Sequence, residues 1–88
     1  MKISFKKSFS RDLKKIKDKV LLQEVKEAIE EVERATLLQT VSNLKQLRGE
    51  SNCFRIQIGD YRIGLKQEGD VFVFVRFLHR KEIYRYFP

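Results

Sequence analysis

Several residue types on which small protein classes depend are scarce in this chain. Its 88 residues include one cysteine, one histidine and one proline, and the proline is the last residue. One cysteine cannot form an internal disulfide, which excludes a disulfide-stapled secreted scaffold. One cysteine and one histidine cannot supply a zinc ligand set, and the sequence has no glycine-rich phosphate loop and no Gly-x-Ser-x-Gly motif. We therefore expect no metal and no cofactor, and any catalysis must rest on acid–base and electrostatic groups.

Long apolar stretches and linkers are also missing. The longest apolar run, residues 71–75, is far shorter than the ~20 residues that span a bilayer. The first residues, MKISFKKSFSRDLKK, contain no apolar core and no small-residue cleavage site, so we expect neither a signal peptide nor a membrane partner. No repeat and no Pro/Gly/Ser-rich linker divides the chain. We therefore expect a single domain over residues 1–88, located in the cytoplasm.

Positive charge is the feature present in excess. The chain has 19 Lys and Arg against 12 Asp and Glu, a formal net charge of +7. Residues 1–20 hold eight basic and two acidic side chains, residues 55–88 hold seven and four, and residues 21–35 hold two and five. Such a field favours a polyanionic partner, which could be nucleic acid, an anionic lipid surface or an acidic protein.

The N-terminal half carries a strand pattern followed by a helix pattern. Ile3 and Phe5 alternate with polar residues, which predicts a short strand with one buried face. Ser8 or Ser10 can cap the helix that follows. Apolar residues then recur at helical spacing, and residues 17–19 interrupt them, so we expect two helices packed as a hairpin. The apolar stripe consists of Phe9, Leu13, Ile16, Val20, Leu22, Val25, Ile29 and Val32. Residues 36–46 are expected to form a connector with one helical turn.

After Gly49 the apolar period changes from helical to two. Residues 53–58, 61–66 and 71–78 predict a three-stranded antiparallel meander, with turns at residues 59–60 and 68–70. The predicted fold class is α+β, in the order β-α-α-β-β-β. The N-terminal strand and the helical hairpin pack on a mainly antiparallel sheet, whose other face is left open.

The predicted open face carries the polar side chains of the meander. By strand parity, Arg55, Gln57, Arg62 and Lys66 share this face. Arg76 joins them if its strand turns Val73, Val75 and Phe77 toward the helices. The tail that leaves the sheet edge adds His79, Arg80, Lys81, Tyr84 and Arg85. Guanidinium groups with a histidine and a tyrosine at the rim suit phosphates and stacked bases, although a plain solvated sheet face would show the same pattern.

Two segments carry a family resemblance. LRGESNCFRIQIGDYRIG followed by VFVFVRFLHRKEIYRYF resembles the C-terminal half of the RelE/ParE superfamily of toxins from type II toxin–antitoxin systems. The shared pattern is Leu-x-Gly, an aromatic-Arg-Ile strand, Gly-Asp-Tyr-Arg, and an apolar strand ending in His-Arg-x-x-Ile-Tyr. The helical start also fits, so the resemblance covers almost the whole chain and implies the same order of elements.

The resemblance also implies a function and partners. In the RelE-like mRNA interferase branch, the reaction is ribosome-dependent mRNA cleavage, in which a ribose 2′-hydroxyl attacks its own 3′-phosphate and leaves a 2′,3′-cyclic phosphate. The alternatives are a ParE-like DNA gyrase inhibitor without chemistry, or an inactive basic RNA-binding module. The implied partners are the ribosome with its mRNA and an acidic, partly disordered antitoxin, which would form a hetero-oligomer with the toxin.

The resemblance implies roles for individual residues of this chain. Arg55, Arg62, Arg80 and Tyr84 match basic and tyrosine positions of the cleaving branch, whereas Gln57 stands where a second basic residue is usual. Arginine stays protonated and is a poor base, so the expected proton acceptor is Tyr84 or His79. The expected catalytic residues are therefore Arg62, Arg80, Tyr84 and His79. The expected RNA- or phosphate-binding residues are Arg55, Gln57, Lys66, Arg76, Lys81 and Arg85.

The residues of the same tail also allow purely structural roles. Arg80 and Tyr84 could simply cover the sheet edge, and His79 could be hydrogen-bonded to the backbone. Cys53 has no second cysteine or nearby histidine in the sequence, so it is expected to be a small buried residue.

Overall fold

A five-stranded mixed sheet forms the centre of the computed structural model, which describes residues 1–88. The strand order is β1-β5-β4-β3-β2; β1 runs parallel to β5, and the other pairs are antiparallel. The strands are β1 (Lys2–Phe5), β2 (Leu44–Gln46), β3 (Cys53–Ile58), β4 (Tyr61–Glu68) and β5 (Val71–His79). The helices are α1 (Lys7–Lys14), α2 (Lys19–Arg34), the 3-10 turn η1 (Leu38–Thr40) and α3 (Ile83–Tyr86).

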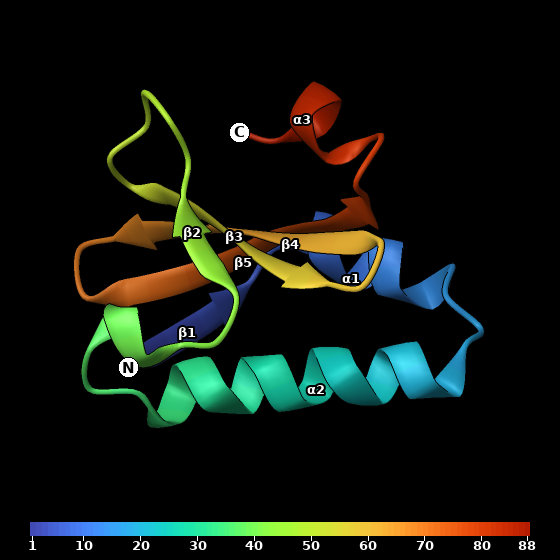
Figure 1. Ribbon diagram of the computed structural model, residues 1–88, viewed down its shortest axis with the longest axis horizontal. Helices are drawn as coiled ribbons and strands as arrows, with labels where there is room; N and C mark the ends of the chain where they lie inside the picture. Colours follow the sequence, from blue (N-terminus) through green and yellow to red (C-terminus); the bar gives the residue numbers. More distant parts are fainter.

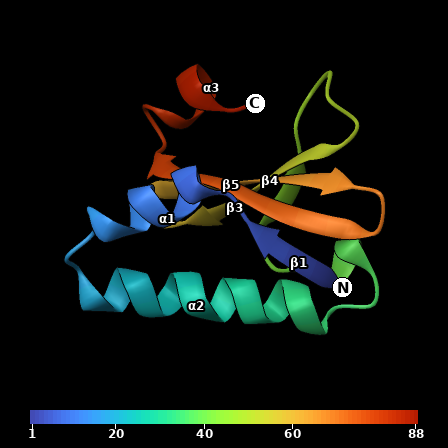
Figure 2. The same ribbon diagram turned by 180° about the vertical axis from the view of Figure 1, so that it is seen from behind.

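The helices occupy three different positions around the sheet. The long helix α2 lies along one face, and the short helix α3 lies over the other (Figure 1). Helix α1 directly follows β1 and continues along the outer edge of β5 (Figure 2). The α+β class and the predicted order of strand, two helices and meander are confirmed.

The break between the two helices is where the sequence places it. The carboxylate of Asp18 accepts hydrogen bonds from the backbone N–H groups of Val20 (3.0 Å) and Leu21 (3.2 Å), so it caps α2. The new helix starts in a different phase, and Val20 is therefore 71% exposed rather than part of the apolar stripe. That part of the stripe prediction is wrong.

The predicted serine cap of α1 is also wrong. Helix α1 begins at Lys7, and its N-cap residue Lys6 makes no side-chain cap. Ser8 lies inside the helix, where its Oγ donates a 2.6 Å hydrogen bond to the carbonyl oxygen of Val75. This serine therefore ties α1 to the edge of β5 instead of starting the helix.

The main core lies between α2 and the sheet. Helix α2 buries Val25, Ala28 and Val32, since these positions recur at helical spacing on one side. From the sheet and α1, the same cluster receives Phe9, Phe54, Ile56, Ile58, Ile63, Leu65, Phe72, Phe74 and Phe77. Phe5 is about half exposed, although its ring stacks on those of Phe9 and Phe74.

The predicted connector at residues 36–46 contains more structure than expected. Its helical turn is η1, but residues 44–46 form the edge strand β2, in which Leu44 pairs with Ile56 and Lys45 with Arg55. A strand of three residues with one apolar side chain is too short to reveal a period of two. The sheet consequently has one strand more than the sequence predicts.

A β-bulge changes which side chains of β5 face the helices. The register shifts between Gly64 and Leu65, which pair with Arg76 and Phe74 respectively, so Val75 is the extra residue. Phe72, Phe74 and Phe77 therefore join the main core. The prediction that Val73, Val75 and Phe77 share the helix side is confirmed only for Phe77. Val73 alternates with the core residues Phe72 and Phe74 and pairs with Lys66, so it faces the other side, and Val75 packs beneath α3.

The face opposite α2 is only partly open, which corrects a further prediction. Cys53, Ile83 and Phe87 form a second, small buried cluster under α3. The Phe87 ring lies directly on Gly64, where a Cβ atom would come within 2.7 Å of it. Cys53 is buried as expected, and this burial raises the pKa of its thiol above the ordinary value.

Candidate nucleic-acid interface

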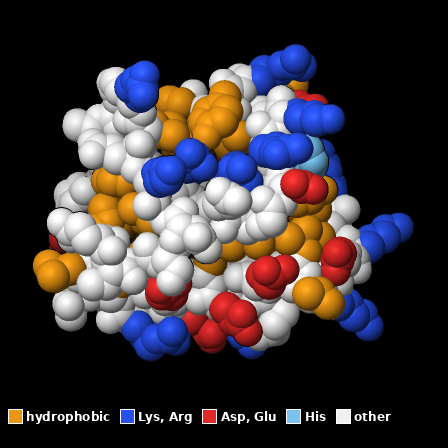
Figure 3. All heavy atoms as spheres, in the orientation of Figure 1, with side chains coloured by type: hydrophobic (Ala, Val, Ile, Leu, Met, Phe, Trp, Pro, Cys, Tyr) orange, Lys and Arg blue, Asp and Glu red, His pale blue; other side chains and the backbone are white.

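The polar face of the sheet is organised as rows across the strands. The register places Lys45, Arg55, Gly64 and Arg76 side by side on β2, β3, β4 and β5. Parity brings Gln57, Arg62 and Lys66 to the same face, as predicted. Figure 3 shows Lys and Arg side chains in a band across the middle of the molecule, while Asp and Glu gather in its lower half, where α2 lies.

Two predicted catalytic arginines meet at the β3–β4 turn. Nη1 of Arg62 donates hydrogen bonds to the carbonyl oxygens of Gly59 and Tyr61, both at 2.9 Å. The backbone N–H of Arg80 donates to the carbonyl of Asp60 (2.7 Å), and its Nε lies 3.9 Å from the Asp60 carboxylate. The turn therefore holds the Arg62 guanidinium and the Arg80 backbone at one end of the sheet, although the two residues are 18 positions apart in the sequence.

His79 lies beside this turn in a defined orientation. It is the register partner of Tyr61, and the two rings meet edge to face with centroids 5.4 Å apart. Its Nδ1 accepts a 3.2 Å hydrogen bond from the backbone N–H of Lys81. With the Nδ1 lone pair engaged, the neutral imidazole carries its proton on Nε2 and can donate from there.

Tyr84 projects from α3 and is 56% exposed. Its neighbours Lys81 and Arg85 are exposed as well. The tail thus presents a phenol and two cations to solvent, on the side of the sheet opposite α2 (Figure 1).

Not every predicted binding residue lies near the turn. Gln57 pairs directly with Arg62, and Arg55 is two residues from Gln57 along β3. Lys66 is four residues from Arg62 along β4, which at the rise of an extended strand is roughly 13 Å away. It therefore marks the opposite end of the face, beside Cys53 and Val73.

Arg76 is held by a carboxylate that sequence reasoning missed. Its Nε and Nη2 donate to Oδ2 and Oδ1 of Asp12 at 2.8 and 3.1 Å, and the backbone N–H of Phe77 donates to the same Oδ2 at 2.9 Å. The side chain of Asp12 is 4% exposed and that of Arg76 is 24% exposed. The hydrogen bonds to Asp12 raise the pKa of the Arg76 guanidinium above its ordinary value. Arg76 therefore lies on the predicted face but is not a free cation.

Two other features were also absent from the sequence analysis. Lys45 was missed because β2 was not predicted. Tyr86 was missed because nothing in its spacing indicates that its ring lies 5.4 Å from the Arg76 guanidinium. The signal that could have found Asp12 is its position next to Leu13, close to the apolar stripe, where an acidic residue needs a partner.

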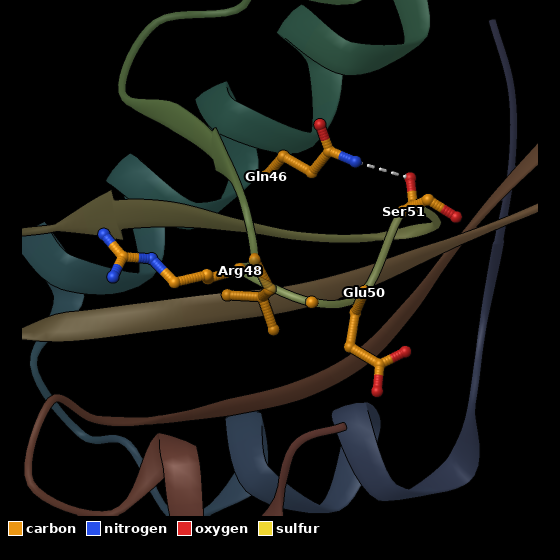
Figure 4. A pocket seen from close by; sticks show the side chains of 6 residues that line it. Gln46, Arg48, Glu50 and Ser51 are labelled. Carbon is orange, nitrogen blue, oxygen red and sulfur yellow. Dashed lines mark hydrogen bonds between the residues drawn. The ribbon is translucent and has the colours of Figure 1, made fainter.

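The largest hollow in the structure lies elsewhere. The β2–β3 loop encloses an open space of about 560 Å³, at the end of β3 away from the Gly59–Asp60 turn. In Figure 4, Gln46 Nε2 donates to the carbonyl oxygen of Ser51 (2.9 Å), while Arg48 and Glu50 point away from each other. No charged side chains converge in this loop, so the arginine-bearing turn is the better candidate site.

The structure shows neither a metal-binding cluster nor a membrane-spanning helix. No three His, Cys, Asp or Glu side chains are grouped so that they could hold a metal ion. None of the helices has both the length and the apolar character that crossing a membrane requires.

Comparison with known proteins places this geometry in a family. The family model described as "ParE toxin of type II toxin-antitoxin system, parDE" matches residues 3–84. Toxin RelE3 of Methanocaldococcus jannaschii is 40% identical over 89 residues, which cover 100% of both chains.

Two solved structures with the same fold are toxin–antitoxin complexes. In the RelB-RelE antitoxin-toxin complex from Methanococcus jannaschii, the matched chain is 39% identical with a TM-score of 0.80, over 96% of this chain and 98% of that one. In the RelBE2 complex from Mycobacterium tuberculosis, the values are 26% identity and a TM-score of 0.67, over 90% and 96%.

Proposed function

We propose that this chain, which belongs to the ParE toxin family of type II toxin–antitoxin systems, cleaves mRNA on the ribosome and so inhibits translation. The observation that carries the proposal is the convergence of Arg62 and Arg80 on the Gly59–Asp60 turn, beside Gln57. His79 lies across the sheet from Arg62, because its ring packs on Tyr61 on the side of the main core. A relative named as a RelE toxin, 40% identical over the full length, supports the same branch.

The proposed reaction is attack of a ribose 2′-hydroxyl on the adjacent 3′-phosphate. The bond from phosphorus to the 2′-oxygen forms, the bond to the leaving 5′-oxygen breaks, and the products are a 2′,3′-cyclic phosphate and a 5′-hydroxyl. The 2′-hydroxyl proton goes to a base, and the 5′-oxygen receives a proton from an acid. Arg62 and Arg80 stabilise the additional negative charge on the phosphorane, since guanidinium groups hold phosphate oxygens through paired N–H donors.

The geometry favours Tyr84 over His79 as the base. Neutral His79 carries its ring proton on Nε2, because Nδ1 is engaged by the N–H of Lys81. With Nδ1 engaged and Nε2 protonated, this tautomer has no free ring nitrogen with which to accept a proton. Tyr84 is 56% exposed and can therefore reach a bound RNA. We therefore assign proton acceptance to Tyr84.

Binding is proposed to rest on the remaining cations of the face and tail. Arg55, next in its row to Lys45, and the exposed Lys81 and Arg85 can each contact a backbone phosphate. Gln57 and Lys66 can add contacts at the two ends of the face. The ribosome would position the mRNA, because a protein of 88 residues without a deep cleft cannot orient the reacting phosphate alone.

An antitoxin partner and a cytoplasmic location are part of the proposal. The structural neighbours from M. jannaschii and M. tuberculosis are complexes of a toxin with its antitoxin. We propose that this chain likewise forms a hetero-oligomer with an acidic, partly disordered antitoxin, because its net charge of +7 favours a negatively charged partner.

The test is cleavage of mRNA on programmed ribosomes by the purified chain, with 5′-end mapping of the products. The Arg62→Ala variant is expected to lose roughly 10²–10³-fold in the single-turnover rate, since one group that stabilises transition-state charge is removed. Arg34→Ala is the matched control, because Arg34 is an exposed arginine at the end of α2.

Other outcomes would separate the alternatives. Intact mRNA together with inhibited DNA gyrase would establish the ParE-like activity and contradict the proposal. RNA binding without cleavage and without gyrase inhibition would indicate an inactive RNA-binding module. Cleavage by Arg62→Ala at the parent rate would contradict the catalytic assignment.

A further inference from the structure

A chain of contacts links helix α1 to the C-terminal segment, defined here as residues 80–88. It begins at Asp12, whose carboxylate accepts three hydrogen bonds from β5: two from the Arg76 guanidinium and one from the Phe77 backbone N–H. These bonds hold the guanidinium plane in one orientation, because a carboxylate and a guanidinium pair through two parallel contacts.

The next contact joins Arg76 to the C-terminal segment. The Cζ atom of Arg76 lies 5.4 Å from the centre of the Tyr86 ring, within the range in which a cation is attracted to an aromatic face. Tyr86 is the last residue of α3, and Tyr84 belongs to the same helical turn. A cation fixed by a buried carboxylate therefore braces the helix that presents Tyr84.

A second contact holds the C-terminal segment beside the Arg76–Tyr86 contact. The Phe87 ring packs on Gly64, which is the register partner of Arg76 on the neighbouring strand. Together with Ile83, Phe87 also covers Cys53. Apart from the contacts of Arg80 with the Gly59–Asp60 turn, α3 is held over the sheet by this small cluster and by the Arg76–Tyr86 contact.

We infer that Asp12 and Arg76 are positioning residues: through the Tyr86 ring they hold the C-terminal segment, and with it Tyr84, in the orientation that catalysis requires. The catalytic part of this inference rests on the proposed cleavage activity. Arg76 then contributes to the rate without contacting RNA, unlike Arg55 or Arg62, because its charge is already paired with Asp12.

The single cysteine provides a readout that does not depend on activity. Cys53 is 1% exposed, and its cover includes two residues of the C-terminal segment. Its reaction with a thiol reagent therefore reports how often that segment opens. Tyr86→Leu keeps an apolar side chain but removes the ring face, whereas Tyr86→Phe keeps the ring. Asp12→Asn is matched by Asp70→Asn, which removes a carboxylate from an exposed ion pair with Lys2.

The expected result is that Tyr86→Leu and Asp12→Asn react with the reagent roughly three- to tenfold faster than the parent, as loss of a cation–aromatic contact predicts. Low urea concentrations should change this rate little, because the opening is local. Tyr86→Phe and Asp70→Asn should react at the parent rate. On programmed ribosomes, Tyr86→Leu should lower kcat with an unchanged KM and an unchanged salt dependence, and Tyr86→Phe should restore kcat.

Three results would count against some part of the inference. Thiol reactivity of Tyr86→Leu equal to that of the parent would overturn the positioning role. A raised KM and a weaker salt dependence in Asp12→Asn or Tyr86→Leu, with kcat unchanged, would mean that Arg76 contacts RNA, and would overturn it too. A parent protein that cuts no RNA would refute the proposed function, while fast labelling of Tyr86→Leu would still support the brace on the C-terminal segment.

Discussion

The two faces of the sheet are covered in different ways. Helix α2, with 16 residues, closes one face over a core of 13 buried residues, whereas α3, with four residues, covers the other over three. Burial of apolar area is the main source of stability, so the α2 face holds the fold together. The α3 face buries little and leaves Arg55 and Arg62 partly exposed. Stability and the candidate chemistry are thus assigned to opposite sides of one sheet.

The largest expected effects are losses of stability from large-to-small substitutions, one on each face of the sheet. Phe74→Ala, on the α2 side, is expected to lower the free energy of unfolding by about 3–5 kcal/mol, since Phe74 is fully buried between Phe5 and Phe9. Phe87→Ala should cost less, roughly 1–2 kcal/mol, because release of the C-terminal segment relieves the cavity. Urea denaturation of both variants checks this. Equal losses would contradict the division of roles between the faces.

Tyr84→Phe should have the next largest effect, which should appear in the cleavage rate and not in the stability of the fold. Deleting the hydroxyl removes the proposed base while the ring remains, so we expect cleavage to fall by roughly 10²-fold with unchanged urea denaturation. Single-turnover cleavage on programmed ribosomes is the measurement, with His79→Ala compared beside it. A Tyr84→Phe variant within a few-fold of the parent, next to an inactive His79→Ala, would transfer the role of the base to His79.

Gly64→Ala should show how the α3 face is closed. An added Cβ would lie 2.7 Å from the Phe87 ring and displace it, at an expected cost of roughly 1–3 kcal/mol, as for other overpacking substitutions. Burial now raises the pKa of the Cys53 thiol above its ordinary value, which lowers the fraction of reactive thiolate. Once the ring is displaced, that pKa should fall toward its ordinary value, so labelling at pH 8 should accelerate.

The control for this substitution lies on the same strand. Gln67→Ala changes an exposed position of β4 and should leave the Cys53 labelling rate unchanged. Labelling of Gly64→Ala at the parent rate across pH 7–9 would mean that the Phe87 ring does not close this face.

Local patterns were sufficient for much of the fold. The alternation in residues 53–58 and 61–66 placed Gln57 and Arg62 on one face, because side-chain direction in a strand depends only on position along it. The interruption of the apolar spacing at residues 17–19 marked the break between α1 and α2, although the Asp18 cap itself was not predicted. The resemblance to the RelE/ParE superfamily, now supported by the family match, rested on such short motifs.

Other features depend on contacts between distant parts of the chain. Asp12 and Arg76 are 64 residues apart, and their pairing required α1 to lie along the edge of β5. The bulge at Gly64 moved Val75 off the helix side, and no period within β5 alone reveals a shift that belongs to its pairing with β4. The strand β2 exists because β3 offers it a partner.

The sequence by itself determined which residue types face the two sides of β3 and β4 and where the helices break, because these depend on neighbours within a few positions. Only the tertiary structure brought Arg62 and Arg80 to one turn, paired Arg76 with Asp12 instead of leaving it free, and laid α3 across a face predicted to be open. Those arrangements depend on packing between distant elements, and on the partners that buried charges and strand edges require. Periodicity along the chain contains no information about such partners.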